Sequence, residues 1–387
     1  MSSITAAIAR FPRMSTVLAV RNMVHDRVRL VVTLIGIVFA VVLIGVQLGL
    51  FIGFARTTSS LIDHAGADLW IMAPGTRNID QSAAISERKL FQALAVPGIQ
   101  EAAKLITEFT LFKRPDGGNE TVIVVGFDPA QGLGAPWQVA EGDVKNLAYA
   151  GTVMIDELYR EKLGVTRIGQ IVEIGGRRAQ VVGFTRGIRS FTQSPYVFAS
   201  FASALDYSRI RSDQTKYVLC RLVPGADAAA MRKALSERLG DVEVLTSGEF
   251  SRRTQFYWMF TTGAGLALLV AALMGLAVGV VVVSQTLYAT TIDHLPEFGT
   301  LRAIGASSRY LYGVIIRQAV LSALAGYGIG LGVTLAIIRA SRNGGTAILL
   351  PGELAAGLLA LTLVMCVGAA AISIRKVTRL DPAMVFK

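Results

Sequence analysis

The chain has 387 residues, of which 52% are hydrophobic and 17% are charged, with a formal net charge of +11. This composition is too apolar for a soluble protein of that length, although nearly half of the chain reads as ordinary globular sequence. The sequence therefore predicts a membrane protein with a sizeable soluble part. Cys220 lies in the globular part and Cys366 in an apolar segment, which argues against a disulfide framework.

The N-terminal segment, residues 1–29, is basic and precedes a long apolar run. Its apolar residues from position 14 to 28 share one helical face, as in an interfacial helix, and a merely basic tail is the open alternative. The run that follows, residues 30–54, could also be a cleaved signal peptide. Because it is much longer than a signal h-region of roughly 7–15 residues, we interpret it as a membrane span.

Four apolar segments are long enough to cross a hydrocarbon core about 30 Å thick, which needs roughly 20 residues as a helix. We expect spans at residues 30–54, 254–288, 311–338 and 352–374. The second contains no charged residue between Arg253 and Asp293. An uninterrupted helix there would be on the order of 58 Å long and would project beyond the bilayer. Because the number of spans is even, both termini are expected on one side.

Basic residues flank the spans unevenly, with a strong excess over acidic residues on one side. The basic segments are 1–29, 289–310 and the tail 375–387. The short opposite loop, 339–351, carries few charges. The positive-inside rule therefore places both termini and segment 289–310 in the cytoplasm and the large domain outside. The basic net charge thus reflects mostly membrane topology, and we expect no nucleic-acid partner.

Residues 55–253 have mixed charge and alternating apolar patterns, which predict an α+β extracytoplasmic domain. Expected strands are 104–112, 121–127, 152–156, 170–174, 179–184, 217–223 and 242–245. Expected helices are 86–94, capped by Ser86, and 227–239, capped by Asp227. The turn signals at 115–118 and 175–176 predict hairpin connections.

No catalytic constellation is visible in the sequence. The three histidines, His25, His64 and His294, are divided between the two sides of the membrane, so they cannot share a metal site or a triad. No phosphate-binding loop of the GxxxxGK[ST] type occurs. We therefore expect no enzyme activity and no bound cofactor or metal, and any ATP that drives this protein must be bound by another polypeptide.

The third span contains a run of four glycines at alternate positions. They are Gly326, Gly328, Gly330 and Gly332, which form two overlapping GxxxG spacings. Small residues at this spacing allow close packing of membrane helices. The spacing leaves open whether the partner helix belongs to the same chain or to a second copy.

The stretch Asp293–Ser308 lies between the second and third spans and is amphipathic. Pro296 stands near its start, and its apolar residues recur at helical spacing between charged ones. This pattern predicts a short helix at the membrane surface. Such a helix can lie flat on the bilayer or contact a soluble partner.

The order of these parts resembles the permease subunits of MacB/FtsX-type ABC transporters. The resemblance covers essentially the whole chain and is most specific in LPEFGTLRAIGASSRYL, residues 295–311, and in the terminal LDPAMVFK, residues 380–387. The segment ADLWIMAPGTRN, residues 67–78, is most similar to the DevC branch. The resemblance implies four spans, with the large domain between the first and second, in a bacterial inner membrane.

The resemblance also implies partners and contact residues. Segment 289–310 would be a coupling helix on a separate cytoplasmic ABC ATPase, which binds ATP and magnesium. The contact residues would be Glu297, Phe298, Leu301, Arg302, Ile304 and Gly305. A second permease copy, a membrane fusion protein and an outer-membrane duct would complete an exporter that transmits ATPase motion to the periplasmic domain. The alternatives are a division-type signal transducer acting on a periplasmic hydrolase, a lipoprotein- or haem-extracting permease, and a membrane-anchored enzyme.

Overall fold

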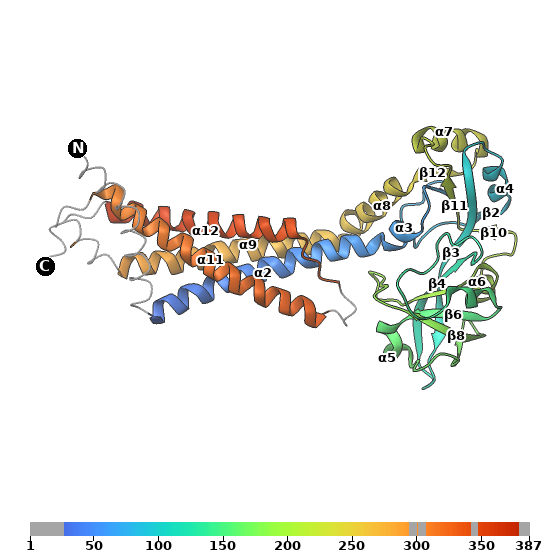
Figure 1. Cartoon of the computed structure of the whole chain (residues 1–387), viewed down its shortest axis with the longest axis horizontal. Coiled ribbons are helices and arrows are strands. Elements are labelled where there is room, and N and C mark those ends of the chain that lie inside the picture. Colours follow the sequence, from blue (N-terminus) through green and yellow to red (C-terminus); the bar gives the residue numbers. More distant parts are fainter. Residues whose placement is uncertain (1–26, 294–299, 301–306, 342–346, 379–387) are drawn as a thin grey trace. The chain divides into compact units, whose positions relative to one another are not determined.

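The computed structural model describes the chain except for residues 1–26, 294–299, 301–306, 342–346 and 379–387 (Figure 1). The chain divides into two compact units. The helical unit contains Met1–Ile52, Ala267–Arg342 and Ile348–Lys387, and the α/β unit contains Gly53–Leu266 and Asn343–Ala347. We describe each unit by itself.

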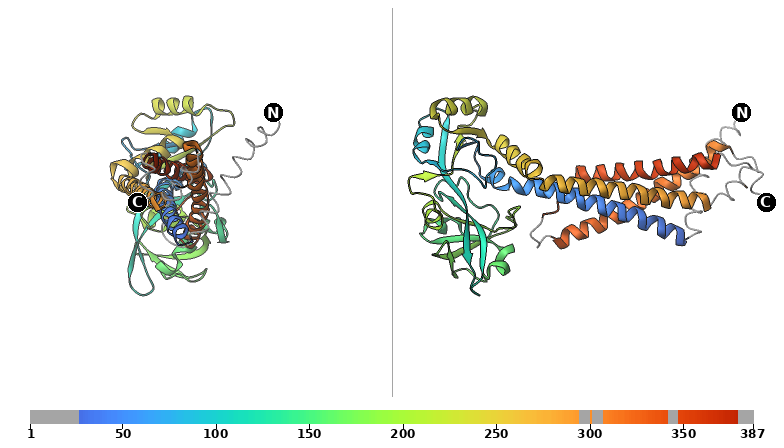
Figure 2. Two further views of the ribbon diagram at one scale, coloured as in Figure 1. Left: turned by 90° about the vertical axis from the view of Figure 1, so that its left-hand side faces the viewer. Right: turned by 180° about the vertical axis from the view of Figure 1, so that it is seen from behind.

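The helical unit is built from four long helices that lie side by side (Figures 1 and 2). They are α2 (Arg27–Thr58), α9 (Ala264–Asp293), α11 (Ser308–Ala340) and α12 (Gly352–Thr378). Each contains a segment that is apolar and long enough to cross a membrane. The segments are Leu30–Thr58, Ala264–Thr286, Tyr312–Ala340 and Gly352–Ile372. Helices α2 and α9 both continue into the α/β unit.

Helix α2 contacts the other three helices through small residues and branched apolar side chains. Glycine has no Cβ atom. If one were added to Gly279 of α9, it would lie 3.0 Å from Cβ of Ala40 in α2, so these two backbones approach closely. Ile37 and Val41 of α2 belong to the same buried cluster as Leu358 of α12. Helix α2 thus packs against α9, α11 and α12.

The segment that we expected to form one uninterrupted helix over residues 254–288 is divided, so that prediction is wrong. Helix α8 (Ser247–Phe256) is followed by the π-helix η3 (Tyr257–Thr261). Gly263 then adopts φ +78°, a left-handed conformation that glycine accepts without strain, and α9 begins at Ala264. The chain therefore has a joint between α8 and α9.

The α/β unit is organised around a large sheet with the order β12-β1-β11-β3-β4-β9-β6-β8-β5, and β7 pairs with both β3 and β8. The strands are β1 (Leu69–Met72), β3 (Ile99–Lys113), β4 (Asn119–Phe127), β5 (Val139–Gly142), β6 (Thr152–Asp156), β7 (Ile171–Ile174), β8 (Arg177–Thr185), β9 (Tyr196–Ser200), β11 (Tyr217–Leu222) and β12 (Glu243–Thr246). A separate two-stranded sheet pairs β2 (Ile85–Ser86) with β10 (Gln214–Thr215).

Strands β3, β4, β9, β6, β8 and β7 close into a ring, because β7 bridges β8 and β3. Side chains alternate across strand β4. Val122 and Val124 belong to one buried cluster, whereas Ile123 and Val125 belong to another. Because successive side chains of a strand point to opposite faces, both faces of this strand are buried.

All seven expected strands are present, with ends that differ by a few residues from the prediction. Both expected helices are also present, as α4 (Arg88–Leu94) and α7 (Ala228–Leu239). Asp227 caps α7 by accepting a hydrogen bond from the Ala229 backbone N–H, as expected. Glu87 holds the cap position of α4 without a capping side-chain bond, and the Ser86 hydroxyl, one residue earlier, accepts a hydrogen bond of 3.4 Å from the Arg88 backbone N–H.

Turns 115–118 and 175–176 connect β3 to β4 and β7 to β8, so both hairpin predictions are confirmed. The remaining helices of the unit are α3 (Ser60–His64), α5 (Arg160–Leu163) and α6 (Phe201–Tyr207), with 3₁₀ turns η1 (Val144–Ala148) and η2 (Glu157–Tyr159).

Candidate functional site

The predicted coupling helix lies outside the described residues. This applies to all six of its contact residues: Glu297, Phe298, Leu301, Arg302, Ile304 and Gly305. After this segment, helix α11 begins at a capped N-terminus, where Ser307 accepts a hydrogen bond from the Tyr310 backbone N–H. The coupling role therefore stays a prediction.

The four glycines of the third span divide into two pairs. A Cβ atom at Gly326 would lie 2.5 Å from Cγ2 of Ile37, and one at Gly330 would lie 2.8 Å from Cβ of Val41. Both distances are too short for real side chains, so these two glycines allow α11 to approach α2 of the same chain. At Gly328 and Gly332 no described atom lies within 4 Å of the added Cβ.

The C-terminal end of α2, which lies in the α/β unit, is connected to helix α8 by polar contacts near the joint. The Gln255 side-chain amide of α8 donates a hydrogen bond to the Ser59 hydroxyl at 2.8 Å. Ser59, just after α2, in turn donates to the Asp63 carboxylate at 2.8 Å. Ser59 is fully buried, so these hydrogen bonds are shielded from solvent competition.

Aromatic side chains connect the same two helices through a third segment. Trp258 of the π-helix packs on Phe191 with ring centroids 4.1 Å apart. Phe191 also meets Phe54 of α2 edge to face, at 5.8 Å. Phe191 lies in the loop between β8 and β9, so this loop contacts both helices at once.

The β8–β9 loop is held by a buried carboxylate at the end of β6. Asp156 accepts hydrogen bonds from the Thr185 hydroxyl at 2.8 Å and from the Ile188 backbone N–H at 2.7 Å. Burial raises the pKa of Asp156, and these hydrogen bonds oppose that shift. Through Asp156, the position of Phe191 depends on the central sheet.

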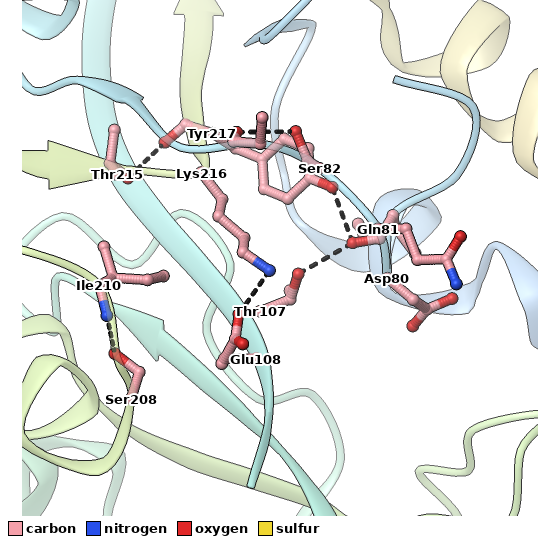
Figure 3. A network of polar contacts seen from close by, with 12 residues as sticks. Asp80, Gln81, Ser82, Thr107, Glu108, Ser208, Ile210, Thr215, Lys216 and Tyr217 are labelled. Carbon is pink, nitrogen blue, oxygen red and sulfur yellow. Dashed lines mark hydrogen bonds and ion pairs between the residues drawn. The ribbon is translucent and has the colours of Figure 1, made fainter. Parts of the chain in front are cut away.

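A second buried loop, between β1 and β2, brings Asp80 to the π-helix. The Asn78 side chain accepts hydrogen bonds from the backbone N–H groups of Asp80 and Gln81, which fixes the turn. The Ile79 carbonyl accepts a bond from the Tyr217 hydroxyl at 2.7 Å. Figure 3 shows Asp80 on this loop, near Tyr217 and the ion pair of Lys216 with Glu108.

Asp80 is almost completely buried, with 6% of its surface exposed. Burial raises its pKa to about 6, whereas the facing Trp258 indole N–H and the charge of Lys216 lower it. Within the described part of the chain, neither Oδ2 of Asp80 nor Nε1 of Trp258 reaches hydrogen-bond geometry with any group. The carboxylate thus meets the π-helix without a fully formed bond.

We name the set of residues at this place the helix junction. It consists of Phe54, Ser59, Asp80, Phe191, Gln255 and Trp258. The sequence analysis did not identify it, because its members come from four segments far apart in the chain. Gly263 and Gly265, which flank Ala264 at the joint, were the sequence signal for the break.

The α/β unit contains one histidine, His64, and one cysteine, Cys220. His64 stacks on Trp137 with ring centroids 4.4 Å apart, so it has a structural contact. Among the described residues, no group of three or more His, Cys, Asp or Glu side chains could hold a metal ion. Cys220 is buried, and burial raises the pKa of its thiol to about 12, which leaves it protonated and unreactive.

Comparison with known families gives two matches that together cover most of the chain. The model of the MacB-like periplasmic core domain matches residues 30–238, which is more than half of the chain. The model of the FtsX-like permease C-terminal domain matches residues 269–382. The first match includes α2 and most of the α/β unit, and the second includes α11 and α12.

Individual relatives and solved structures are distant. An uncharacterized ABC transporter permease of Mycobacterium tuberculosis is 24% identical over 377 residues, which are 95% of this chain and 98% of the relative. A second one from that species is 24% identical over 309 residues, covering 79% and 81%.

Among solved structures, the periplasmic region of MacB from Actinobacillus actinomycetemcomitans has a TM-score of 0.38 at 12% identity and covers 50% of this chain and 96% of that one. The extracellular domain of the transporter YknZ from Gram-positive bacteria has a TM-score of 0.36 at 13% identity and covers 46% and 98%. Both TM-scores lie below 0.5, so the family assignment depends on the family models.

Proposed function

The chain belongs to the MacB/FtsX-type family of ABC transporter permeases, and on this premise we propose that it is the membrane subunit of an ATP-driven export complex. Four apolar helices, with the α/β unit between the first and second, make it a multi-pass membrane protein. ATP and magnesium are bound by a separate ABC ATPase, and this chain contributes movement rather than chemistry.

The observation that carries this proposal is the helix junction. Helix α2 is continuous from Arg27 to Thr58, and α9 leads through the joint into α8. Both helices therefore extend from the helical unit to the same cluster of contacts in the α/β unit. A displacement of either helix changes the contacts of Phe191 with Phe54 and Trp258 or the Gln255–Ser59 hydrogen bond.

In this proposal, the predicted coupling helix is the part of the chain that contacts the ATPase. We propose that Glu297 and Arg302 form charge-assisted contacts with the ATPase, while Phe298, Leu301 and Ile304 pack on it and Gly305 allows close approach. Nucleotide binding then moves segment 289–310, and this movement reaches the helix junction through α9. This cytoplasmic orientation follows from the excess of basic residues flanking the spans.

The complete complex contains further partners in this proposal. A second copy of the permease forms a homodimer, and a membrane fusion protein with an outer-membrane duct receives cargo from the α/β unit in the periplasm. The inner membrane is the expected location. The similarity of residues 67–78 to the DevC branch is what supports the fusion protein.

Affinity purification from native membranes tests the proposal. The tagged wild type should retain an ABC ATPase in mild detergent, whereas the Glu297→Arg, Arg302→Glu double variant should lose it while still inserting in the membrane. The matched control is Arg309→Glu, since this basic residue lies outside the proposed contact set. Equal ATPase recovery with wild type and the double variant would contradict the coupling role, and recovery of no ATPase would contradict the permease complex.

A further inference from the structure

A hollow of about 820 Å³ opens in the α/β unit beside the end of helix α8. Its walls come from the loop after β1, the end of α7, strand β12 and the π-helix. This volume lies within the range of sites that bind small molecules. The proposed function does not involve this groove. None of the residues of the helix junction lines it.

The groove carries one unpaired positive charge. Arg253 forms an ion pair with Glu243 at 2.6 Å and donates to the Thr76 carbonyl, so these two charges offset one another. Arg77 also lines the groove and is exposed, and in the part of the chain that the structure describes it has no ion pair or hydrogen bond. A free guanidinium is well suited to a phosphate group, which it can bind in a bidentate manner.

Aromatic side chains line the same groove as Arg77. Phe256 and Tyr257 line the groove, and Phe256 is 62% exposed. Phe260, which is 49% exposed, packs against Phe256 with ring centroids 5.2 Å apart. A groove that is lined by both an unpaired guanidinium and exposed aromatic surface fits a ligand with an anionic head and an apolar chain.

The position of the groove along the chain indicates where such a ligand comes from. Thr261 forms part of the wall, and the apolar membrane segment begins only three residues later, at Ala264. Three residues span at most about 11 Å even when fully extended. The headgroup layer of a bilayer is roughly 5–8 Å thick on each side. The groove therefore begins within reach of lipid headgroups.

We propose that this groove binds the headgroup of a phospholipid, with the phosphate on Arg77 and the first part of an acyl chain along Phe256 and Tyr257. The bound lipid would lie beside the joint between α8 and α9, because Tyr257 belongs to the π-helix. This inference goes beyond the proposed function and requires neither an ATPase nor cargo.

Photocrosslinking identifies the occupant directly. Phe256 is replaced by benzoylphenylalanine in the full-length chain, which is reconstituted in vesicles of phosphatidylethanolamine and phosphatidylglycerol. After irradiation, mass spectrometry of the peptide that contains position 256 should show a phospholipid adduct. Because this position is exposed and aromatic in the wild type, the probe leaves the fold intact.

Two charge reversals separate specific binding from lipid that merely surrounds the protein. Arg77→Glu should lower the yield of the adduct about fivefold or more. Arg209→Glu is the matched control, because Arg209 is exposed and likewise has no ion pair among the described residues, but lines a different hollow. The proposal is overturned by an adduct to a polypeptide or to a second copy, by no adduct, or by a lipid adduct that Arg77→Glu leaves unchanged.

Discussion

The two helices that connect the units of this protein differ in continuity. Helix α2 runs without a break over 32 residues and has Gly326 and Gly330 of α11 packed against it. The other connection is divided into α8, a π-helix and α9, with Gly263 in a left-handed conformation between the last two. One connection is thus a continuous helix, whereas the other has a joint.

In the proposed function, this difference predicts where movement between the units is absorbed. A packed, continuous helix transmits displacement along its axis, whereas a π-helix next to a left-handed glycine allows a change of direction. The joint lies where Trp258 meets Phe191 and Asp80. We therefore expect variants of the α2 contact to affect stability most, and variants of the joint to affect it less.

The largest effect is expected from Gly330→Leu. The new side chain would collide with Val41, whose Cβ lies 2.8 Å from the position of an added Cβ, so α11 must move away from α2. We expect a loss of about 3 kcal/mol or more in stability, at the upper end of overpacking costs. The measurement is thermal unfolding of the full chain in detergent, followed by circular dichroism at a helix wavelength, because Trp70, Trp137 and Trp258 all lie in the α/β unit.

Gly328→Leu is the matched control for this variant, because no described atom lies within 4 Å of its added Cβ. Its unfolding temperature should equal that of the wild type when both are monomeric. If the two variants unfold at the same temperature, the packing of α11 on α2 is not what stabilises the helical unit.

The next effect is a dependence of stability on pH that comes from the buried carboxyl group of Asp80. Asp80 has a pKa of about 6 in the folded protein, against 3.8 for an unperturbed aspartate. Between these values the folded state holds a proton that the unfolded state lacks, so stability falls as the pH rises from about 4 to 6 and stays lower above it. At about 1.4 kcal/mol per pKa unit, the full cost is up to about 3 kcal/mol.

Asp80→Asn removes this titration. The variant should match the wild type near pH 4 and be more stable at pH 7.5, as measured by unfolding temperature across this range. Asp156, whose pKa is also raised by burial, contributes a slope of the same sign in both proteins, so the difference between the two curves isolates Asp80. Parallel curves would show that Asp80 is not neutralised in the folded state.

A smaller loss is expected from Trp258→Ala, which removes the contact with Phe191 at the helix junction. Since Trp258 is only partly buried, we expect about 2 kcal/mol, below the usual cost for a fully buried aromatic residue. Phe256→Ala serves as the control, because its ring is 62% exposed and its loss should cost less than about 1 kcal/mol. Urea unfolding in detergent gives both values, and equal costs would argue against the junction.

The smallest effect belongs to Gly263→Ala. No described atom lies within 4 Å of the added Cβ, so the cost is the left-handed φ of +78° alone, about 1 kcal/mol. Gly313→Ala, in α11 with an equally open surrounding, should be neutral or stabilising in thermal unfolding. If Gly263→Ala left the unfolding temperature unchanged, the chain would leave the left-handed conformation at residue 263 without a loss of stability.

The sequence predicted the parts of the fold that have a local signal. Apolar runs located the four membrane helices, and turn residues located the hairpins at 115–118 and 175–176. Strand β1 (Leu69–Met72) and strand β9 (Tyr196–Ser200) were missed, because all their residues are buried and an alternating pattern is absent. The ring closed by β7 depends on pairing between distant segments, which no periodicity reveals.

The candidate site was less predictable than the fold. The uncharged run after Arg253 is indistinguishable by composition from one long helix, so the joint was not expected. Phe54, Asp80 and Phe191 come together only through tertiary packing. The predicted ATPase contacts rest on family resemblance, and the predicted glycine contacts could not distinguish Gly326 from Gly328, which face different surroundings.

Hydrogen–deuterium exchange of the complex with its ATPase is the most direct test of the proposed transmission. Adding a non-hydrolysable ATP analogue should change exchange in the π-helix Tyr257–Thr261 and leave strand β6 unchanged, because β6 lies in the buried sheet. The Glu297→Arg, Arg302→Glu variant should show no change at either place. Unaltered exchange at the π-helix in a wild-type complex with bound nucleotide would contradict the account.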